Sequence, residues 1–202
     1  MVFFTSDLHF GHGKIIDHCG RPFSSVEEMD RVMIENWNRR VRKNDKVYIV
    51  GDIVWDKNKV GYYMEQLSGK KYLIVGNHDT TWSKREENKK YFADILQYME
   101  GSFNSHRVTL CHYPMLEWAE SRNDAPKHLG YHIHGHIHNR ISEEYIPLYR
   151  QVNALNAGAD INGFSPVTFN ELLENNNRFK LACLESREDR EYLLQGIKSI
   201  MG

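Results

Sequence analysis

The sequence predicts an α/β protein, and three observations support that prediction. Short apolar runs, rich in β-branched and aromatic residues, recur along the chain and are typical of buried strands. Stretches with apolar residues at helical spacing separate several of these runs. The runs are apolar on both faces, as strands are when helices cover the sheet. Composition and pattern leave open whether the strands form one central sheet or two stacked sheets. The runs are residues 2–4, 47–50, 72–75, 108–111 and 131–133.

The first half of the chain contains one clear helix signal. Residues Ser25–Glu28 fit a helix-capping box, in which a serine and a glutamate satisfy the first backbone amides. The apolar residues that follow are spaced to form a core-facing stripe. A loop with a short helix is expected over residues 10–19, and another short helix near residues 59–67. The stripe consists of Val26, Met29, Val32, Met33, Trp37 and Val41.

The second half alternates in the same way, with less regular signals. A charged helix is expected over residues 84–99, with Tyr91, Ile95 and Tyr98 on its inner face. Residues 120–130 are polar and are expected to form a loop near the site, where a loop can shape substrate choice. A strand is expected at 152–156, a helix start at 167–174, a last strand at 178–184, and a charged helix or a loose tail at 185–200.

Composition sets the broad class of the protein. The 202 residues predict a single domain, 1–202, and the 24 aromatic side chains argue against disorder. The 26 basic and 27 acidic residues leave no basic field for nucleic acid or a membrane surface. Three distant cysteines predict no disulfide framework. With neither a signal-peptide pattern nor a long apolar run, we expect a cytoplasmic protein, of unspecified oligomeric state.

Metal-capable side chains follow all five apolar runs. Because ligand groups gather at the carboxyl ends of strands in α/β sheets, we expect these side chains to meet at one site. Imidazole, carboxylate and amide groups suit divalent ions such as Mn, Fe, Ni or Zn. Two such ions, with one shared carboxylate, would clamp a phosphate and activate water, while a nearby histidine protonates the leaving oxygen. The side chains are Asp7 and His9; Asp52; Asn77, His78 and Asp79; His112; and His136 and His138.

These motifs, in this order, resemble those of the calcineurin-like metallophosphoesterase superfamily. A lone Asp-x-His or Gly-Asp pair is a weak signal, but the set includes Gly-Asn-His-Asp directly after a strand and spans residues 7–138. The resemblance implies a four-layer fold of two facing mixed sheets flanked by helices. It further implies that Asp7, His9, Asp52 and His138 hold one metal ion and that Asp52, Asn77, His112 and His136 hold the other. Asp52 is then the bridge, and His78 is the general acid, with Asp79 behind it.

The resemblance also implies an activity. We expect a phosphoester hydrolase, and a phosphodiesterase in particular, that uses a metal-bridging hydroxide as nucleophile on a small phosphate ester or nucleotide. Manganese is the foremost expectation for the two ions, with Fe, Ni and Zn as alternatives. Protein phosphatases of the superfamily carry Asp-Arg-Gly after Gly-Asp and end their third motif in Glu. This chain has Ile-Val-Trp-Asp after Asp52 and ends the third motif in Asp79, which argues against that class.

Other functions remain open from the sequence. The same site would serve a nucleotide phosphomonoesterase, a pyrophosphohydrolase or a nuclease. A non-catalytic scaffold of this fold is the alternative outside enzymes, although all the motif ligands are present. The His-x-His run at 132–136 superficially resembles metallo-β-lactamases, but the Asp-His continuation of that pattern is missing.

Two further residues are candidates for contact with substrate. His12 lies in the same short loop as Asp7 and His9, within reach of a bound phosphate. Arg21 offers a planar fork for a phosphate, or else it anchors a loop. His134, two residues before His136, is either a group that orients a metal ligand or an ordinary hydrogen-bonded residue of a strand end.

Overall fold

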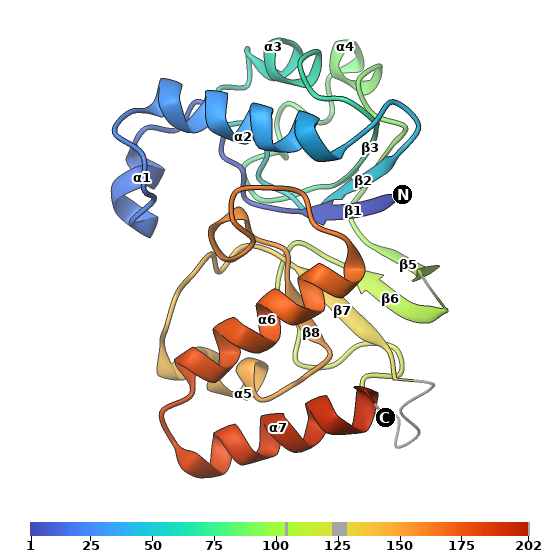
Figure 1. Ribbon diagram of the computed structural model, residues 1–202. Helices are drawn as coiled ribbons and strands as arrows, with labels where there is room; N and C mark the ends of the chain where they lie inside the picture. Colours follow the sequence, from blue (N-terminus) through green and yellow to red (C-terminus); the bar gives the residue numbers. More distant parts are fainter. Residues whose placement is uncertain (104, 123–128, 202) are drawn as a thin grey trace.

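The computed structural model describes residues 1–103, 105–122 and 129–201 (Figure 1). Two four-stranded sheets pack against each other, and helices cover their outer faces. The predicted α/β fold with two helix-flanked sheets is therefore confirmed. No helix in these described ranges is both long enough and apolar enough to cross a membrane.

The first sheet consists of four parallel strands in sequence order. These are β1 (Val2–Thr5), β2 (Lys46–Ile49), β3 (Lys70–Ile74) and β4 (Asp94–Leu96). Parallel pairing sends all four carboxyl ends to one edge of the sheet, so the loops that follow β1, β2 and β3 begin close together.

The second sheet is mixed, as the resemblance implied. The same expectation is wrong for the first sheet, whose described strands all pair in parallel. Strand β5 (Met99–Phe103) pairs antiparallel with β6 (His106–Leu110), and β7 (Tyr131–His134) and β8 (Ala154–Asn156) then add in parallel. The carboxyl ends of β6, β7 and β8 therefore also share one edge.

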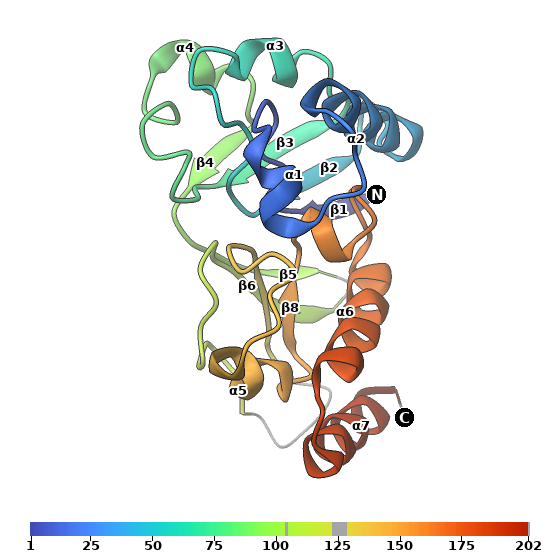
Figure 2. The ribbon, with the colours of Figure 1, turned by 90° about the vertical axis from the view of Figure 1, so that its left-hand side faces the viewer.

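Helices form the two outer layers of the molecule (Figures 1 and 2). Those of the first half of the chain lie over the first sheet, and those of the second half over the second. The first set comprises α1 (Lys14–Cys19), α2 (Val26–Arg40), α3 (Val60–Met64) and α4 (Glu86–Lys89). The second set comprises α5 (Ile146–Tyr149), α6 (Phe169–Cys183) and α7 (Arg187–Met201), with single 3-10 turns at Glu143–Tyr145 and Ala159–Ile161.

Alternation along the strands divides the core between the layers. Phe3 and Val47 point toward the buried stripe of α2, which includes Met29 and Trp37. Their strand neighbours point the other way, into a cluster shared with the second sheet and α6. That cluster includes Phe4, Tyr48, Ile74, Leu110, Ile133, Leu155 and Phe169. Because both faces of the sheets are buried, the sheets are held rigidly enough to fix the loops at their edge.

The capping signal of α2 is confirmed, with one difference in its bonding. The backbone N–H of Glu28 donates to Ser25 Oγ (3.2 Å), as a capping box requires. The Glu28 carboxylate, however, accepts from the backbone and hydroxyl of Ser24 (2.7 and 2.6 Å) and not from the Ser25 amide.

The single helix predicted over 84–99 is wrong. Only α4 is helical there, and the chain then forms β4 and enters β5. Leu73 of β3 pairs with Ile95, and Tyr98, expected to face inward, is 45% exposed. The edge of β3 offers unpaired backbone groups, and satisfying them outweighs the helical preference of the local Lys and Glu residues.

The last strand predicted at 178–184 is also wrong, because this segment is the second half of α6. Its buried residues recur every three or four positions, from Phe169 and Leu172 to Lys180 and Cys183, and a capping box of Thr168 and Glu171 starts the helix. Of the two alternatives for 185–200, the helix is observed, as α7. In the predicted loop at 120–130, residues 123–128 lie outside the described part.

Candidate metal centre

Backbone hydrogen bonds join the loops after β1 and β2 where the two strands end. The amides of Asp7 and His9 donate to the carbonyls of Gly51 and Asp52, both at 3.0 Å. The amide of Phe10 continues the pattern to Ile53 (2.9 Å). The two motifs are thus held in register beyond the ends of their strands.

The backbone is strained at the residues that carry the predicted ligands. Eight non-glycine residues of the described ranges have a left-handed backbone with positive φ, a conformation that is costly for residues with a Cβ and that concentrates at functional sites. Five of the eight are predicted ligands, which supports a functional role for this cluster. The five are Asp7 (φ 54°), His9 (52°), Asp52 (55°), His136 (72°) and His138 (51°).

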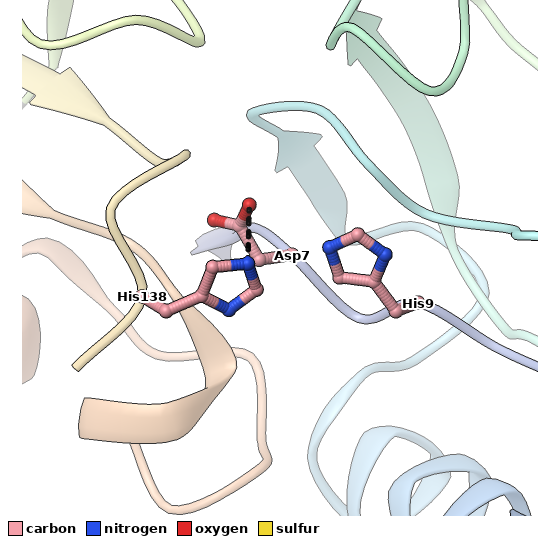
Figure 3. A group of neighbouring side chains, drawn as sticks. All are labelled: Asp7, His9 and His138. Atoms are coloured by element: carbon pink, nitrogen blue, oxygen red, sulfur yellow. Dashed lines mark ion pairs between the residues drawn. The ribbon is translucent and has the colours of Figure 1, made fainter. Parts of the chain in front are cut away.

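Asp7, His9 and His138 bring one nitrogen or oxygen each to a common point (Figure 3). Their ligand atoms lie within 4.8 Å of one another, and the Nε2 of His138 is 3.8 Å from Asp7 Oδ1. Asp7 follows β1 and His138 follows β7, so residues 131 positions apart in sequence form one group. All three belong to the predicted first metal position.

Asp52 lies between the two halves of the cluster. Its Oδ2 atom is 3.7 Å from His9 Nε2 and 3.5 Å from His112 Nε2. Asp52 also forms a candidate metal group with Asp7 and His112. The same oxygen therefore faces one histidine from each predicted metal position. A carboxylate that bridges two metal ions needs this arrangement.

Asn77, His112 and His136 complete the other half. The Asn77 amide oxygen lies 3.0 Å from His112 Nε2 and 3.0 Å from His136 Nδ1. The second ring nitrogen of His112 donates to the carbonyl of Val50 (2.8 Å), which leaves Nε2 turned toward the cluster. The structure therefore brings together all seven predicted ligands.

Gly76, before Asn77, is required by close packing at the cluster. A Cβ at this position would lie 2.2 Å from Asp52 Oδ1 and 2.6 Å from the Asp52 amide. Those distances are far below a van der Waals contact. The glycine of the Gly-Asn-His-Asp motif thus allows β3 to end directly against the Asp52 loop.

His9 provides the clearest sign that the cluster fits a cation. The residue is 2% exposed, and neither ring nitrogen has a hydrogen-bond partner among the described residues. Buried polar groups without partners are rare in folded proteins. Burial also holds the pKa of His9 well below its usual range, so the imidazole is neutral and offers a lone pair. Buried imidazole and carboxylate groups here could therefore hold divalent metal ions.

Charge within the cluster moves other pKa values in the opposite direction. Burial works against the charged form of His112, but Asp52 and Asp7 outweigh it and raise its pKa to about 9. Burial likewise opposes the charge on His138, while Asp160, Cys19 and Asp7 raise its pKa to about 10. In the metal-free protein these two histidines are therefore protonated near neutral pH.

His78 lies at the solvent-facing side of the cluster. Its side chain is 39% exposed, and its Nε2 is 3.9 Å from Asp52 Oδ2. Its ring centre is 5.4 Å from that of His9 and 4.9 Å from that of Trp55. His78 is thus beside the predicted ligands while remaining open to an incoming molecule.

Asp79 does not lie behind His78 as expected. Its carboxylate is fully buried and accepts hydrogen bonds from the backbone amides of Asp52 (2.7 Å), Ile53 (3.2 Å) and Gly76 (2.9 Å). Burial, then the charge of Asp52, raises the pKa of Asp79 to about 7. Its observed contacts fix the turn that carries Asp52 and do not orient the His78 ring.

Arg21 is an anchor of the loop after β1 and not a free phosphate clamp. Its guanidinium is buried and donates to the carbonyls of Asp7 (2.7 Å) and Leu8 (2.9 Å). It also makes two hydrogen bonds to Asp160, from Nε (2.8 Å) and Nη2 (3.2 Å). The observed contacts thus match the loop-anchoring alternative for Arg21.

Asp160 is the residue of this region that sequence reasoning missed. It lies in the 3-10 turn at Ala159–Ile161, and its Oδ2 is 2.8 Å from His138 Nδ1. A signal was present, because Asp160 follows the apolar strand β8 just as the predicted ligands follow theirs.

His12 lies at the rim of the cluster, where its ring stacks on Trp55. The ring centres are 3.7 Å apart and the planes differ by 4°. Trp55 itself is 45% exposed. His134, by contrast, is buried on β7 and pairs with the carbonyl of Gly135 (3.0 Å), which is the hydrogen-bonded strand-end alternative.

The chain is similar to several proteins over most of its length. The chain is 31% identical to the uncharacterized protein MJ1445 of Methanocaldococcus jannaschii over 176 residues, covering 86% of this chain and 89% of that protein. It is 29% identical to the Gene 66 protein of Mycobacterium phage D29, covering 75% and 85%. A crystal structure of a protein of unknown function from Aquifex aeolicus, AQ665, superposes with a TM-score of 0.66 at 27% identity, covering 86% of this chain and 98% of that one.

The model of the calcineurin-like phosphoesterase family matches residues 1–113. The matched region runs from β1 to the histidine after β6, and it includes four of the five motifs that surround the cluster. The fifth motif, with His136 and His138, joins the same cluster in space. The chain belongs to the calcineurin-like phosphoesterase family.

Proposed function

We propose that this protein hydrolyses phosphodiesters in a reaction that depends on two divalent metal ions. Family membership supports a metal-dependent phosphoester hydrolase. The observation that carries the proposal is the position of Asp52 Oδ2, which faces His9 from one predicted metal position and His112 from the other. Two cations that share this oxygen would be close enough to act on one phosphate.

The residues divide into two sets around that oxygen. Asp7, His9 and His138 would hold one ion with Asp52, and Asn77, His112 and His136 would hold the other. When bound, such ions stabilise negative charge on phosphate oxygens and lower the pKa of water. Mixed nitrogen and oxygen ligands accept several divalent ions, and selection among them depends on geometry and metal availability. We propose Mn²⁺, with Fe, Ni and Zn as alternatives.

His78 is the proposed proton donor to the leaving oxygen. A diester leaves an alkoxide that needs a proton, so an acid at the substrate side of the cluster is required. The His78 ring is partly exposed and its backbone amide donates to Asp52 Oδ1 (2.9 Å), which fixes the residue beside the predicted ions. Asp79 stabilises this arrangement because its carboxylate accepts a hydrogen bond from the backbone amide of Asp52.

The stacked pair of His12 and Trp55 is the proposed contact for the substrate beyond its phosphate. Both rings lie next to the cluster, since His12 is 5.5 Å and Trp55 6.4 Å from the His9 ring, centre to centre. The Nδ1 of His12 is buried and has no hydrogen-bond partner among the described residues. A small phosphate ester or a nucleotide fits a site rimmed in this way.

The test is a substrate panel on protein stripped with a chelator and then supplied with Mn²⁺, Ni²⁺, Mg²⁺ or Zn²⁺. We expect bis-p-nitrophenyl phosphate to be hydrolysed faster than p-nitrophenyl phosphate, and only after metal is restored. Preference for the monoester, or for nucleoside phosphates, would replace the diesterase proposal with a monoesterase or pyrophosphohydrolase. Hydrolysis that survives complete chelation would refute metal dependence.

The role of His78 is tested by His78→Ala. Removing a positioned acid commonly lowers the rate by about 100- to 10,000-fold, whereas Mn²⁺ content should not change. The control is His18→Ala, which removes another exposed histidine, on α1. Unchanged turnover in His78→Ala would remove His78 from the mechanism.

A further inference from the structure

We propose that Asp160 positions His138 for metal binding and that Arg21 holds Asp160 in place. The inference rests on the proposed use of metal ions at this site. Its central residue, Asp160, lies outside all five motifs and beyond residue 113, where the match to the family model ends.

The contact between Asp160 and His138 fixes the tautomer of the imidazole. Asp160 Oδ2 accepts two hydrogen-bond contacts, from His138 Nδ1 at 2.8 Å and Arg21 Nη2 at 3.2 Å. A carboxylate paired with a guanidinium is ionised and can only accept, so the proton between Asp160 and His138 belongs to Nδ1. Nε2 is then the nitrogen that faces Asp7 Oδ1, at 3.8 Å, and it is the atom that gives up its proton when a cation binds. A carboxylate behind a histidine ligand is a common way to orient metal sites.

Arg21 ties this pair to the opposite side of the cluster. Its hydrogen bonds go to Asp160 on one side and to the carbonyls of Asp7 and Leu8 on the other. The remaining Nη1 proton points toward the Met29 sulfur (3.4 Å). With all its donors engaged, the guanidinium links the loop after β1 to the turn after β8, and so links Asp7 to His138.

Burial makes this linkage rigid. The side chains of Arg21 and Asp160 are 0% and 1% exposed, so water does not compete for their hydrogen bonds. A planar fork with two contacts to one carboxylate also fixes the angle between the groups, which a lysine cannot do. The chain Arg21–Asp160–His138 therefore sets the position of a ligand from the second sheet relative to ligands of the first.

The experiment measures Mn²⁺ binding directly, by calorimetry and by electron paramagnetic resonance, in the wild type and in Asp160→Asn. We expect two ions in the wild type, and a loss of about 10- to 100-fold in affinity for one of them in the variant. The matched control is Asp45→Asn. Asp45 is also a buried, hydrogen-bonded aspartate, but it precedes β2 at the end away from the cluster.

A spectroscopic readout separates positioning from general damage. In the wild type loaded with diamagnetic Zn²⁺, the ¹⁵N shifts of His138 should show a protonated Nδ1, and Asp160→Asn should alter that signature. Arg21→Lys provides a second variant if Asp160→Asn does not fold. It keeps the charge but loses the fork, and we expect a smaller loss of affinity at the same ion.

The outcomes distinguish this inference from the proposed function. Wild-type Mn²⁺ affinity at both positions in folded Asp160→Asn and Arg21→Lys would overturn the inference, and so would a wild type that binds no Mn²⁺. A wild type that binds two ions but cleaves no diester would refute the proposed function alone, while the effect of Asp160→Asn on binding would still support the positioning role.

Discussion

The backbone amide of His136 donates to both carboxylate oxygens of Asp7, at 3.1 and 3.0 Å. These residues are 129 positions apart, one after β1 and the other after β7. Their contact joins the carboxyl edge of the first sheet to that of the second. The predicted metal site therefore lies between the edges of the two sheets. The distances among its ligands depend on how closely these edges approach.

Gly135→Ala should separate these edges. A Cβ at Gly135 would lie 2.0 Å from Ser6 Oγ and 2.4 Å from Asp7 Oδ2, so the loop after β7 would have to move away from β1. We expect a loss of at least about tenfold in Mn²⁺ affinity, since misplaced ligands weaken metal sites. Gly13→Ala is the control, because an added Cβ there meets only Val26 at 4.0 Å. Equal Mn²⁺ affinity in both variants would contradict the close approach.

Metal binding should release protons and strengthen as the pH rises. The metal-free protein holds His112 with a pKa of about 9 and His138 with a pKa of about 10, both raised above 6.5. A histidine must be neutral to bind a metal ion, so near pH 7.5 each of these imidazoles loses a proton when an ion binds. The free protein thus carries more protons than the loaded one, and affinity increases with pH up to about 9–10. Calorimetry in buffers of different ionisation enthalpy measures the release, and an affinity that stays constant from pH 7 to 9 would exclude it.

Asp79→Ala should destabilise the fold more than Asp79→Asn. Alanine leaves three buried amides without an acceptor, those of Asp52, Ile53 and Gly76, at a cost of about 1–3 kcal/mol each. Asparagine keeps one acceptor oxygen and the shape of the side chain. Urea unfolding of chelator-treated protein gives the free energies. If Asp79 instead acted through His78, both variants would unfold like the wild type and would shift only the pH profile of the rate.

Lys180→Met should remove a pH dependence of stability. Lys180 is buried in α6, and its ammonium donates to the carbonyls of Gln151 (2.7 Å) and Ala154. Burial lowers its pKa from 10.5 to about 7. Between those values the unfolded chain binds more protons at this residue than the folded one, so the free energy of unfolding rises with pH.

The size of that rise is roughly 3–5 kcal/mol, because each pKa unit corresponds to about 1.4 kcal/mol. The measurement is urea unfolding of both proteins at pH 7 and at pH 10. The wild type should gain stability relative to Lys180→Met over this range. Parallel curves for the two proteins would show that the lysine keeps an ordinary pKa.

The sequence was sufficient to identify the strands that carry the site. Each of these strands is a short apolar run followed within three residues by a predicted site residue, and both features are local. The parallel order of the strands then sends Asp7, Asp52 and Asn77 to one edge without any further information. This is why the predicted ligands meet in the structure.

The sequence could not predict the segment around β4 and β5. Helical propensity at 84–99 is a local property, whereas the need for Ile95 to pair with Leu73 comes from an exposed sheet edge that only the assembled fold creates. The opposite error occurred at 178–184, where burial of Lys180 and Cys183 on one helix face depends on the sheet beneath α6.

The sequence by itself determined the fold class, the family and the set of residues that gather at the cluster. Residue type and position relative to a strand are local properties, and a sequence shows them directly. Only the tertiary structure decided what the charged groups around that set do. From residue type alone, Arg21 and Asp79 could each contact a substrate or bond to the backbone. Asp160 could either stabilise a turn or orient a metal ligand. Their roles follow from which partners lie within hydrogen-bond distance in the folded chain, because residues distant in sequence become neighbours only there. For Arg21 that partner is Asp160, which lies 139 positions away.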